Sequence, residues 1–122
     1  MRVRRDNPVN YRLCNQTVTI YHQDGEKYTR TIYHERAFLD FKKTQSVDKT
    51  GSKEVNSFLL VVPCEVQAVF VGDKVLLGEG AEILTREDWA ALIPARVPSL
   101  GVVRYADPKY WNGKLVHVEA GG

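Results

Sequence analysis

The sequence has 122 residues, of which 43% are hydrophobic and 26% are charged, values typical of one soluble globular domain. Its net charge of +2 is too small to predict nucleic-acid binding, and no apolar run approaches the roughly 18 residues that a membrane helix needs. No signal-peptide core follows the N-terminus. We expect a single domain over residues 1–122 that stays in the cytoplasm, with a flexible N-terminal arm over residues 1–12.

The first elements predicted along the chain are the two strands of a hairpin. Residues 16–21 alternate between polar and apolar side chains, which is the period of a half-buried strand. Asp24 and Gly25 then form a strong turn signal, because both residue types tolerate a positive φ. Residues 27–34 return as the second strand, and residues 37–41 predict a third.

Residues 42–54 (KKTQSVDKTGSKE) form the most unusual segment of the chain. Val47 is its single apolar residue, so the segment buries too little surface to offset the entropy of ordering itself. This composition predicts a long polar loop, and loops of this length in small domains are usually functional or disordered. We expect it to bind a partner through Lys42, Lys43, Gln45, Val47, Asp48, Lys49, Thr50, Ser52 and Lys53.

The next segments predict further strands. Residues 58–62 are an apolar run ended by Pro63, typical of a strand buried on both faces. Residues 66–71 could pair with residues 74–77 if Gly72 and Asp73 make a tight turn. Alternatively, the chain bends there and a new strand begins, and the sequence leaves both arrangements open.

One helix is predicted, over residues 86–92. Thr85 is placed to cap it, Asp88 stands at the reciprocal capping position, and Pro94 ends it. The last two strands are expected at residues 101–105 and 114–119, with turn signals at residues 107–108 and 112–113. The aromatic residues around this turn are of the type that anchors protein interfaces. They are Tyr105, Tyr110 and Trp111.

Together these elements predict a mainly β fold. Six to eight short strands, regular turns and one short helix (about 86–92) indicate a small antiparallel β-barrel or sandwich that carries a long polar loop (about 42–54).

The sequence offers no catalytic or metal-binding pattern. Residues 48–52 (DKTGS) nearly match the phosphorylation motif of ion-pumping ATPases, but the chain is far too short and lacks their nucleotide-binding segments. Cys14 and Cys64 have no CxxC spacing, which favours free thiols. The three histidines have no HxxxH spacing; His22 and His34 are expected to be exposed, and His117 to face away from the core. We expect no enzyme, no cofactor and no metal.

Several segments resemble a family of small uncharacterised proteins encoded in the structural modules of tailed phages and prophages of Gram-positive bacteria. The similar segments are residues 12–21, 47–52, 56–60, 69–75, 107–113 and 117–122. The layout is also similar, more loosely, to phage minor capsid proteins of the head-completion or head–tail joining type. Those are small β-barrels with a long loop that assemble as a ring beneath the portal.

The resemblance implies a non-enzymatic structural protein of the virion, made in the bacterial cytoplasm. Its expected role is that of a head-completion or head–tail connector adaptor, which forms a homo-oligomeric ring and docks to portal and tail proteins. A tail-completion protein is a less favoured variant of this hypothesis. The alternatives are a β-barrel that binds a small ligand or a peptide, and an enzyme with a phosphate-binding loop at residues 48–52. A barrel interior filled by apolar side chains would argue against the binding module.

Overall fold

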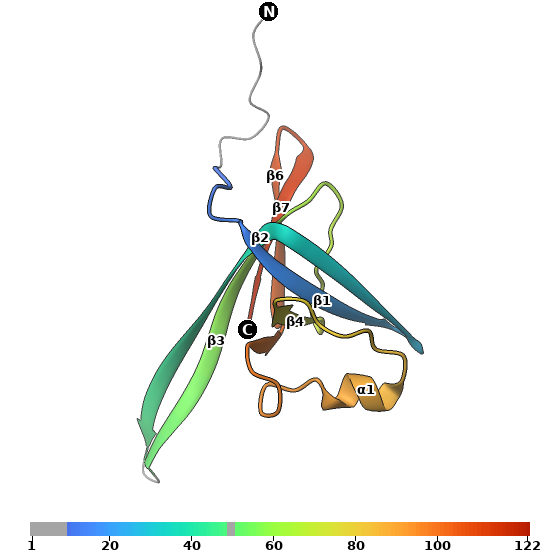
Figure 1. Cartoon of the computed structure of the whole chain (residues 1–122). Coiled ribbons are helices and arrows are strands. Elements are labelled where there is room, and N and C mark those ends of the chain that lie inside the picture. Colours follow the sequence, from blue (N-terminus) through green and yellow to red (C-terminus); the bar gives the residue numbers. More distant parts are fainter. Residues whose placement is uncertain (1–9, 49–50) are drawn as a thin grey trace, which may run out of the picture.

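The computed structural model describes the backbone of residues 10–48 and 51–122, and the side chains of residues 10–42 and 57–122. These residues form antiparallel strands and one short helix (Figure 1). The elements are β1 (Gln16–Asp24), β2 (Lys27–Asp48), β3 (Gly51–Pro63), β4 (Lys74–Leu77), α1 (Arg86–Ala91), β5 (Leu100–Val102), β6 (Tyr105–Trp111) and β7 (Lys114–Gly121).

The strands form one antiparallel sheet that curls into a half-barrel. Their order in the sheet is β5-β4-β1-β2-β3-β7-β6. The two outermost strands, β5 and β6, follow each other in the chain with only Val103 and Arg104 between them, so the sheet curves back on itself (Figure 1). The prediction of a mainly β, antiparallel barrel-like or sandwich-like fold with one short helix is confirmed.

Strand β2 runs through both halves of the sheet. Its first part pairs with β1 as far as Ala37, and its second part pairs with β3 from Phe38 onward. The register with β1 shifts at this point, and Glu35 has a φ of 54°. A bulge of this kind bends a strand and increases its local twist. The backbone N–H of Glu35 donates to Thr17 Oγ1 across the bend (3.1 Å).

Apolar side chains fill the inside of the curled sheet. Strands β1, β2, β3 and β7 contribute alternate residues to this core, as expected for a sheet with one buried face. Strand β4 adds Val75, and Val69 and Val103 come from outside the strands. The buried cluster comprises Val18, Ile20, Ala37, Leu39, Phe58, Leu60, Val62, Val69, Val75, Val103, Val118 and Ala120.

Local sequence signals account for both tight hairpins. Asp24 pairs with Lys27, which leaves Gly25 with a φ of 62° as the first residue of a two-residue turn. In the last hairpin, Asn112 and Gly113 both have positive φ, as a type I′ turn requires. The turn predicted at residues 112–113 is confirmed, and the first turn lies one residue later than predicted, because Asp24 belongs to β1 and the turn is made by Gly25 and Glu26.

The helix prediction is also confirmed, with an end one residue earlier than expected. The Thr85 side chain accepts from the Asp88 N–H, and Asp88 accepts in return from the Thr85 N–H. No residue of α1 is buried. Trp89 attaches the helix, because Lys74 Nζ donates to its carbonyl oxygen (2.7 Å) and lies 4.4 Å from its ring centroid, while Tyr28 stacks beside it.

Several strand predictions need correction. Residues 27–34 and 37–41, predicted as two strands, both lie in β2, and residues 101–105, predicted as one strand, are divided between β5 and the start of β6. Residues 66–71 form no strand: Asp73 accepts from the Phe70 N–H and closes a turn, so the alternative with a bend before β4 is the correct one. Residues 58–62 are buried on one face only, since Leu59 is 38% exposed. Residues 107–108 lie inside β6 and make no turn. Pro108 is tolerated there because β6 is an edge strand.

The flexible N-terminal arm was predicted over residues 1–12, of which residues 1–9 lie outside the described residues. Tyr11, which was expected to be part of a flexible arm, contacts β7 through a 2.7 Å hydrogen bond between its hydroxyl and His117 Nδ1. Arg12 and Leu13 are exposed, as expected.

Candidate functional site

The predicted polar loop at residues 42–54 is a two-stranded ribbon. Lys42 pairs with Ser57, and the pairing continues to Asp48 opposite Gly51. The loop prediction is wrong because it weighed only side-chain burial, whereas a hairpin can order its backbone through its own hydrogen-bond ladder. We call residues 42–48 and 51–57 the arm.

The arm projects beyond the rest of the sheet. In the described residues, the pairing of β2 with β1 ends at Ala37, and the pairing of β3 with β7 begins at Leu59. The two strands of the arm therefore pair only with each other in the described structure, and they extend away from the sheet at the lower left of Figure 1. At roughly 3.4 Å per residue, β2 extends about 20 Å beyond Lys42. Both outer edges of this ribbon carry backbone groups that can pair with another chain.

The structure separates the predicted partner-binding residues into two groups. Most of them lie on the arm: Lys42, Lys43, Gln45, Val47 and Asp48 on β2, and Ser52 and Lys53 on β3. Lys49 and Thr50 lie outside the described residues.

The aromatic group, expected on a turn, lies along the edge strand β6. Tyr105, Tyr110 and Trp111 are 44%, 63% and 40% exposed. Tyr105 lies near the base of the arm. It pairs across the strands with Gly121, which pairs with Leu59, which in turn pairs with Asp40. Tyr110 and Trp111 lie at the opposite end of β6, so the predicted residues do not form one continuous site.

Phe58 fastens the base of the arm to the sheet. Its ring is 7% exposed and stacks against Phe41, with centroids 5.7 Å apart. Its backbone N–H donates to the Gly122 carbonyl (3.2 Å). A Cβ atom added to Gly101 would lie 2.5 Å from the ring, and one added to Gly121 would lie 2.6 Å from the Phe58 carbonyl oxygen. The glycines therefore allow this close packing.

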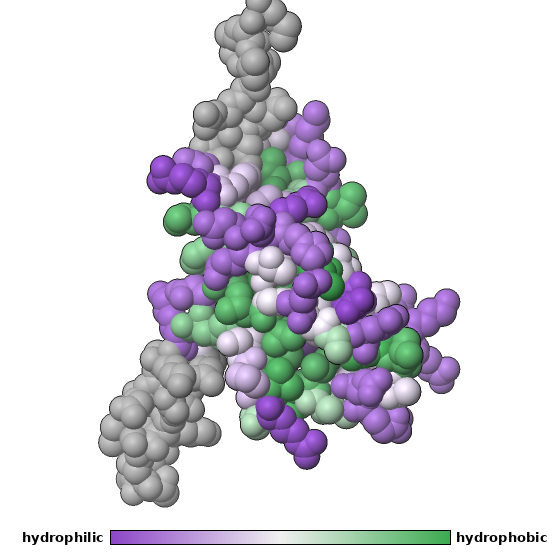
Figure 2. Space-filling view, viewed as in Figure 1, coloured by the Kyte–Doolittle hydropathy of each residue, from purple (hydrophilic) through white to green (hydrophobic). Residues whose placement is uncertain are grey.

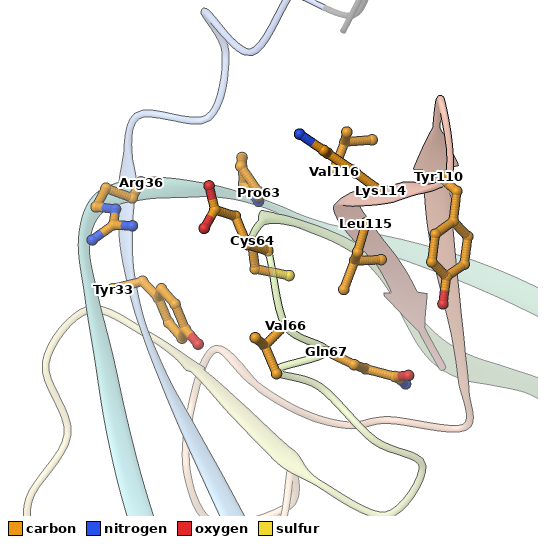
Figure 3. Close-up of a pocket in the computed structure, with 12 residues that line it drawn as sticks. Tyr33, Arg36, Pro63, Cys64, Val66, Gln67, Tyr110, Lys114, Leu115 and Val116 are labelled. Carbon is orange, nitrogen blue, oxygen red and sulfur yellow. The ribbon is translucent and has the colours of Figure 1, made fainter. Parts of the chain in front are cut away.

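An open cavity of about 1280 Å³ lies between the bend of β2, the segment after β3 and the β6–β7 hairpin (Figure 3). This cavity could not be foreseen from the sequence, because its walls come from three distant segments. Its lining comprises Tyr33, Arg36, Pro63, Cys64, Glu65, Val66, Gln67, Tyr110, Gly113, Lys114, Leu115 and Val116.

The thiol in this cavity is not activated. Burial raises the pKa of Cys64, and a hydrogen bond from the Ala68 backbone offsets this only in part. Burial likewise raises the pKa of Tyr33; the nearby Cys64 adds to the increase and Arg36 opposes it. A nucleophilic cysteine is favoured by a lowered pKa, and the pKa of Cys64 is shifted in the opposite direction. Both cysteines are free, as the sequence predicted.

A second, smaller groove of about 270 Å³ lies on the outer face of the sheet, beside the N-terminal segment. His117 points to this face, opposite Val118, as predicted, but it is only 5% exposed. Its ring bonds to Tyr11 on one side and to Glu119 Oε2 on the other (2.9 Å). The burial of His117 could not be foreseen, because its partner Tyr11 lies 106 residues away in the sequence.

His22 and Asp73 form a partly buried pair that joins β1 to the start of β4. His22 Nδ1 lies 2.5 Å from Asp73 Oδ1, and Asp73 Oδ2 accepts from the Phe70 N–H (2.9 Å). Asp73 is 1% exposed, and burial raises its pKa although the hydrogen bond with His22 opposes this. His22 was expected to be exposed; its side chain keeps 37% exposure beside Phe70. His34 is exposed, as expected.

This raised pKa predicts a pH-dependent contribution to stability. Folded Asp73 binds a proton more tightly than its unfolded counterpart, so its contribution is greatest at low pH and falls as pH rises from 3.8 through the raised pKa. Denaturant unfolding of the wild type and of Asp73→Asn, from about pH 3 to about pH 6, measures it. The wild type should lose stability relative to the variant over this range. A constant difference, or one of opposite slope, would contradict the assignment.

In the described part of the chain, no group of three His, Cys, Asp or Glu side chains is placed to hold a metal ion. No helix among these residues is long and apolar enough to cross a membrane. Buried side-chain polar atoms in the same residues all have hydrogen-bond partners, so none is left aimed at a missing ligand. The arm and the open cavity are thus the main candidate sites for binding.

No family model, no curated protein and no solved structure matches this chain.

Proposed function

We propose that this chain is a non-enzymatic structural protein of a phage or prophage virion, a head-completion or head–tail connector adaptor that docks through its arm. The arm is the observation that carries the proposal. It is a polar ribbon that pairs with nothing else in the described structure, and isolated two-stranded hairpins are only marginally stable in water. A portal or tail protein that pairs with one of its edges would stabilise it by main-chain hydrogen bonds.

The packing of the sheet argues against the alternative of a ligand-binding barrel. Val, Leu, Ile and Phe side chains make up most of the buried cluster inside the half-barrel. The buried polar side chains, which are Thr19, Asp73, Lys74 and His117, bond to other groups of the protein. Figure 2 shows polar and apolar residues interspersed on the face in view, a mixture suited to contacts with other subunits. In the proposed role the chain assembles in the bacterial cytoplasm, becomes part of a homo-oligomeric ring and remains in the virion.

Shortening the arm tests this function. Residues 47–52 are replaced by Asn-Gly, so that Ser46 and Lys53, which already pair, are joined by a two-residue turn. The truncated protein should unfold at the wild-type temperature, because the pairing of β2 with β1 and of β3 with β7 lies outside the deleted residues. A phage that carries it should yield no more infectious particles than a phage lacking the gene.

The matched control changes a hairpin tip elsewhere. Gly25 and Glu26, which form the turn between β1 and β2, are replaced by Asn-Gly. This variant should assemble normally. Wild-type titres from the arm variant would end the proposal, and loss of assembly in both variants would show that the arm has no special role.

A further inference from the structure

The open cavity carries unpaired positive charge. Arg36 lies on the bulge of β2 and Lys114 follows the β6–β7 turn, and both line the cavity (Figure 3). Neither forms a salt bridge with any carboxylate among the described side chains. Glu65 also lines the cavity, so two positive charges and one negative charge leave a net charge of +1. Such a lining favours an acidic partner.

An acidic segment of the same chain has the complementary charge. Residues 78–88 contain Glu79, Glu82, Glu87 and Asp88 against a single cation, Arg86, which gives a net charge of −3. Asp88 is engaged in the helix cap, whereas the three glutamates are exposed and have no described cation partner.

The acidic segment is held in one shape. The Tyr21 hydroxyl donates to the Ala81 carbonyl (2.7 Å), and Arg30 Nη1 donates to the Gly80 carbonyl (2.8 Å). Thr19 Oγ1 accepts from the Gly80 N–H (2.8 Å). A segment already ordered in this way loses little conformational entropy when it binds.

Each of the two surfaces also exposes an apolar side chain. Val66 in the cavity is 79% exposed and Leu84 in the acidic segment is 74% exposed. These are the two highest values for large hydrophobic residues in the described part of the chain. Exposed apolar residues within a charged rim are typical of protein–protein contacts.

Most of the acidic segment lies away from the cavity, although Leu77, just before the segment, is two strands across the sheet from Tyr33 in the cavity lining. The β6–β7 turn beside the cavity is at the top of Figure 1, and α1, which ends the acidic segment, is at the bottom. One copy cannot bring them together, whereas two copies can. A contact between two different surfaces of the same chain is heterologous, and it generates a ring when the rotation closes.

We propose that the cavity of one copy receives the acidic segment, residues 78–88, of a second copy, with Arg36 and Lys114 facing its glutamates and Val66 meeting Leu84. This contact deepens the proposed function, on which it rests for its biological meaning, by naming the surfaces that join neighbouring subunits. The purified chain suffices to test it, because self-association is measured without phage, portal or tail proteins.

The experiment reverses the charge of each surface separately. One variant carries Arg36→Glu and Lys114→Glu, so that both of its surfaces are acidic. The other carries Glu79→Lys and Glu82→Lys, so that both are basic; these positions lie outside α1 and its cap. Sedimentation equilibrium should show that the wild type associates and that each variant alone does so about tenfold more weakly or not at all.

An equimolar mixture of the two variants should associate again. Every contact in the mixture then joins an acidic surface to a basic one, and restored association also shows that both variants are folded. A control with Arg12→Glu and Lys27→Glu makes the same charge change outside both surfaces and should associate as the wild type does.

Three results would overturn the contact. They are a monomeric wild type at its highest soluble concentration, unchanged association of either variant, and a mixture that stays monomeric. None of these bears on the arm, whose truncation is scored by infectious titre, so the two proposals fail separately.

Discussion

Replacing Phe58 with alanine is expected to lower the free energy of unfolding by about 3–5 kcal/mol, a large share of the stability of a small domain. The ring is 7% exposed and packs between Phe41 and the backbone of Gly101. A cavity left beside a backbone cannot close without moving a strand, so little of the lost packing should be recovered. Denaturant unfolding followed by circular dichroism measures the change.

Leu59→Ala is the matched control for this substitution. Leu59 is the next residue of β3, but it points to the opposite face and is 38% exposed. Its truncation should cost about 1 kcal/mol, less than that of Phe58, because more than a third of Leu59 is exposed to solvent and the alanine leaves no enclosed cavity. Equal losses for the two substitutions would show that Phe58 has no particular role at the base of the arm.

Gly121→Ala is expected to lower the free energy of unfolding by about 1–3 kcal/mol, although it adds only a methyl group. The new Cβ would lie 2.6 Å from the Phe58 carbonyl oxygen and 2.6 Å from the Tyr105 hydroxyl. The Tyr105 ring can rotate away, but the carbonyl belongs to a paired strand. Gly121 is itself fixed on both sides, opposite Leu59 and Tyr105.

A double variant separates these two contacts. When Tyr105→Ala is added to Gly121→Ala, most of the loss should remain, because the backbone oxygen still blocks the methyl group. Gly113→Asn serves as a control: its φ of 77° suits asparagine and no atom lies within 4 Å of its Cβ position. Full recovery in the double variant would place the strain in the tyrosine ring instead.

Elements with a local cause could be predicted from the sequence. The positive φ values of Gly25 and Gly113 follow from residue type, and the reciprocal bonds of Thr85 and Asp88 form within one helical turn. The alternation in residues 16–21 likewise identified β1. In each case the deciding interactions lie within a few residues of each other, so the sequence pattern contains them.

Elements that depend on backbone pairing and on turns without a clear side-chain pattern could not be predicted. The sequence of the arm lacks apolar alternation, and only the register between β2 and β3 makes it a ribbon. Residues 66–71 look like a strand, yet the turn that Asp73 closes bends them away from any pairing. The cavity could not be predicted for a different reason, because Arg36 and Lys114 come from distant segments and line one cavity only in the folded sheet.

The two unpaired edges of the arm affect how readily the free subunits aggregate before assembly. An exposed ribbon edge is a template for pairing with any other unpaired strand, which is how many proteins aggregate. Charged residues, especially lysine, oppose such pairing at exposed edges, and the arm sequence contains Lys42, Lys43 and Lys53. A composition that is poor for a core is therefore well suited to keeping newly made subunits soluble until their partner is present.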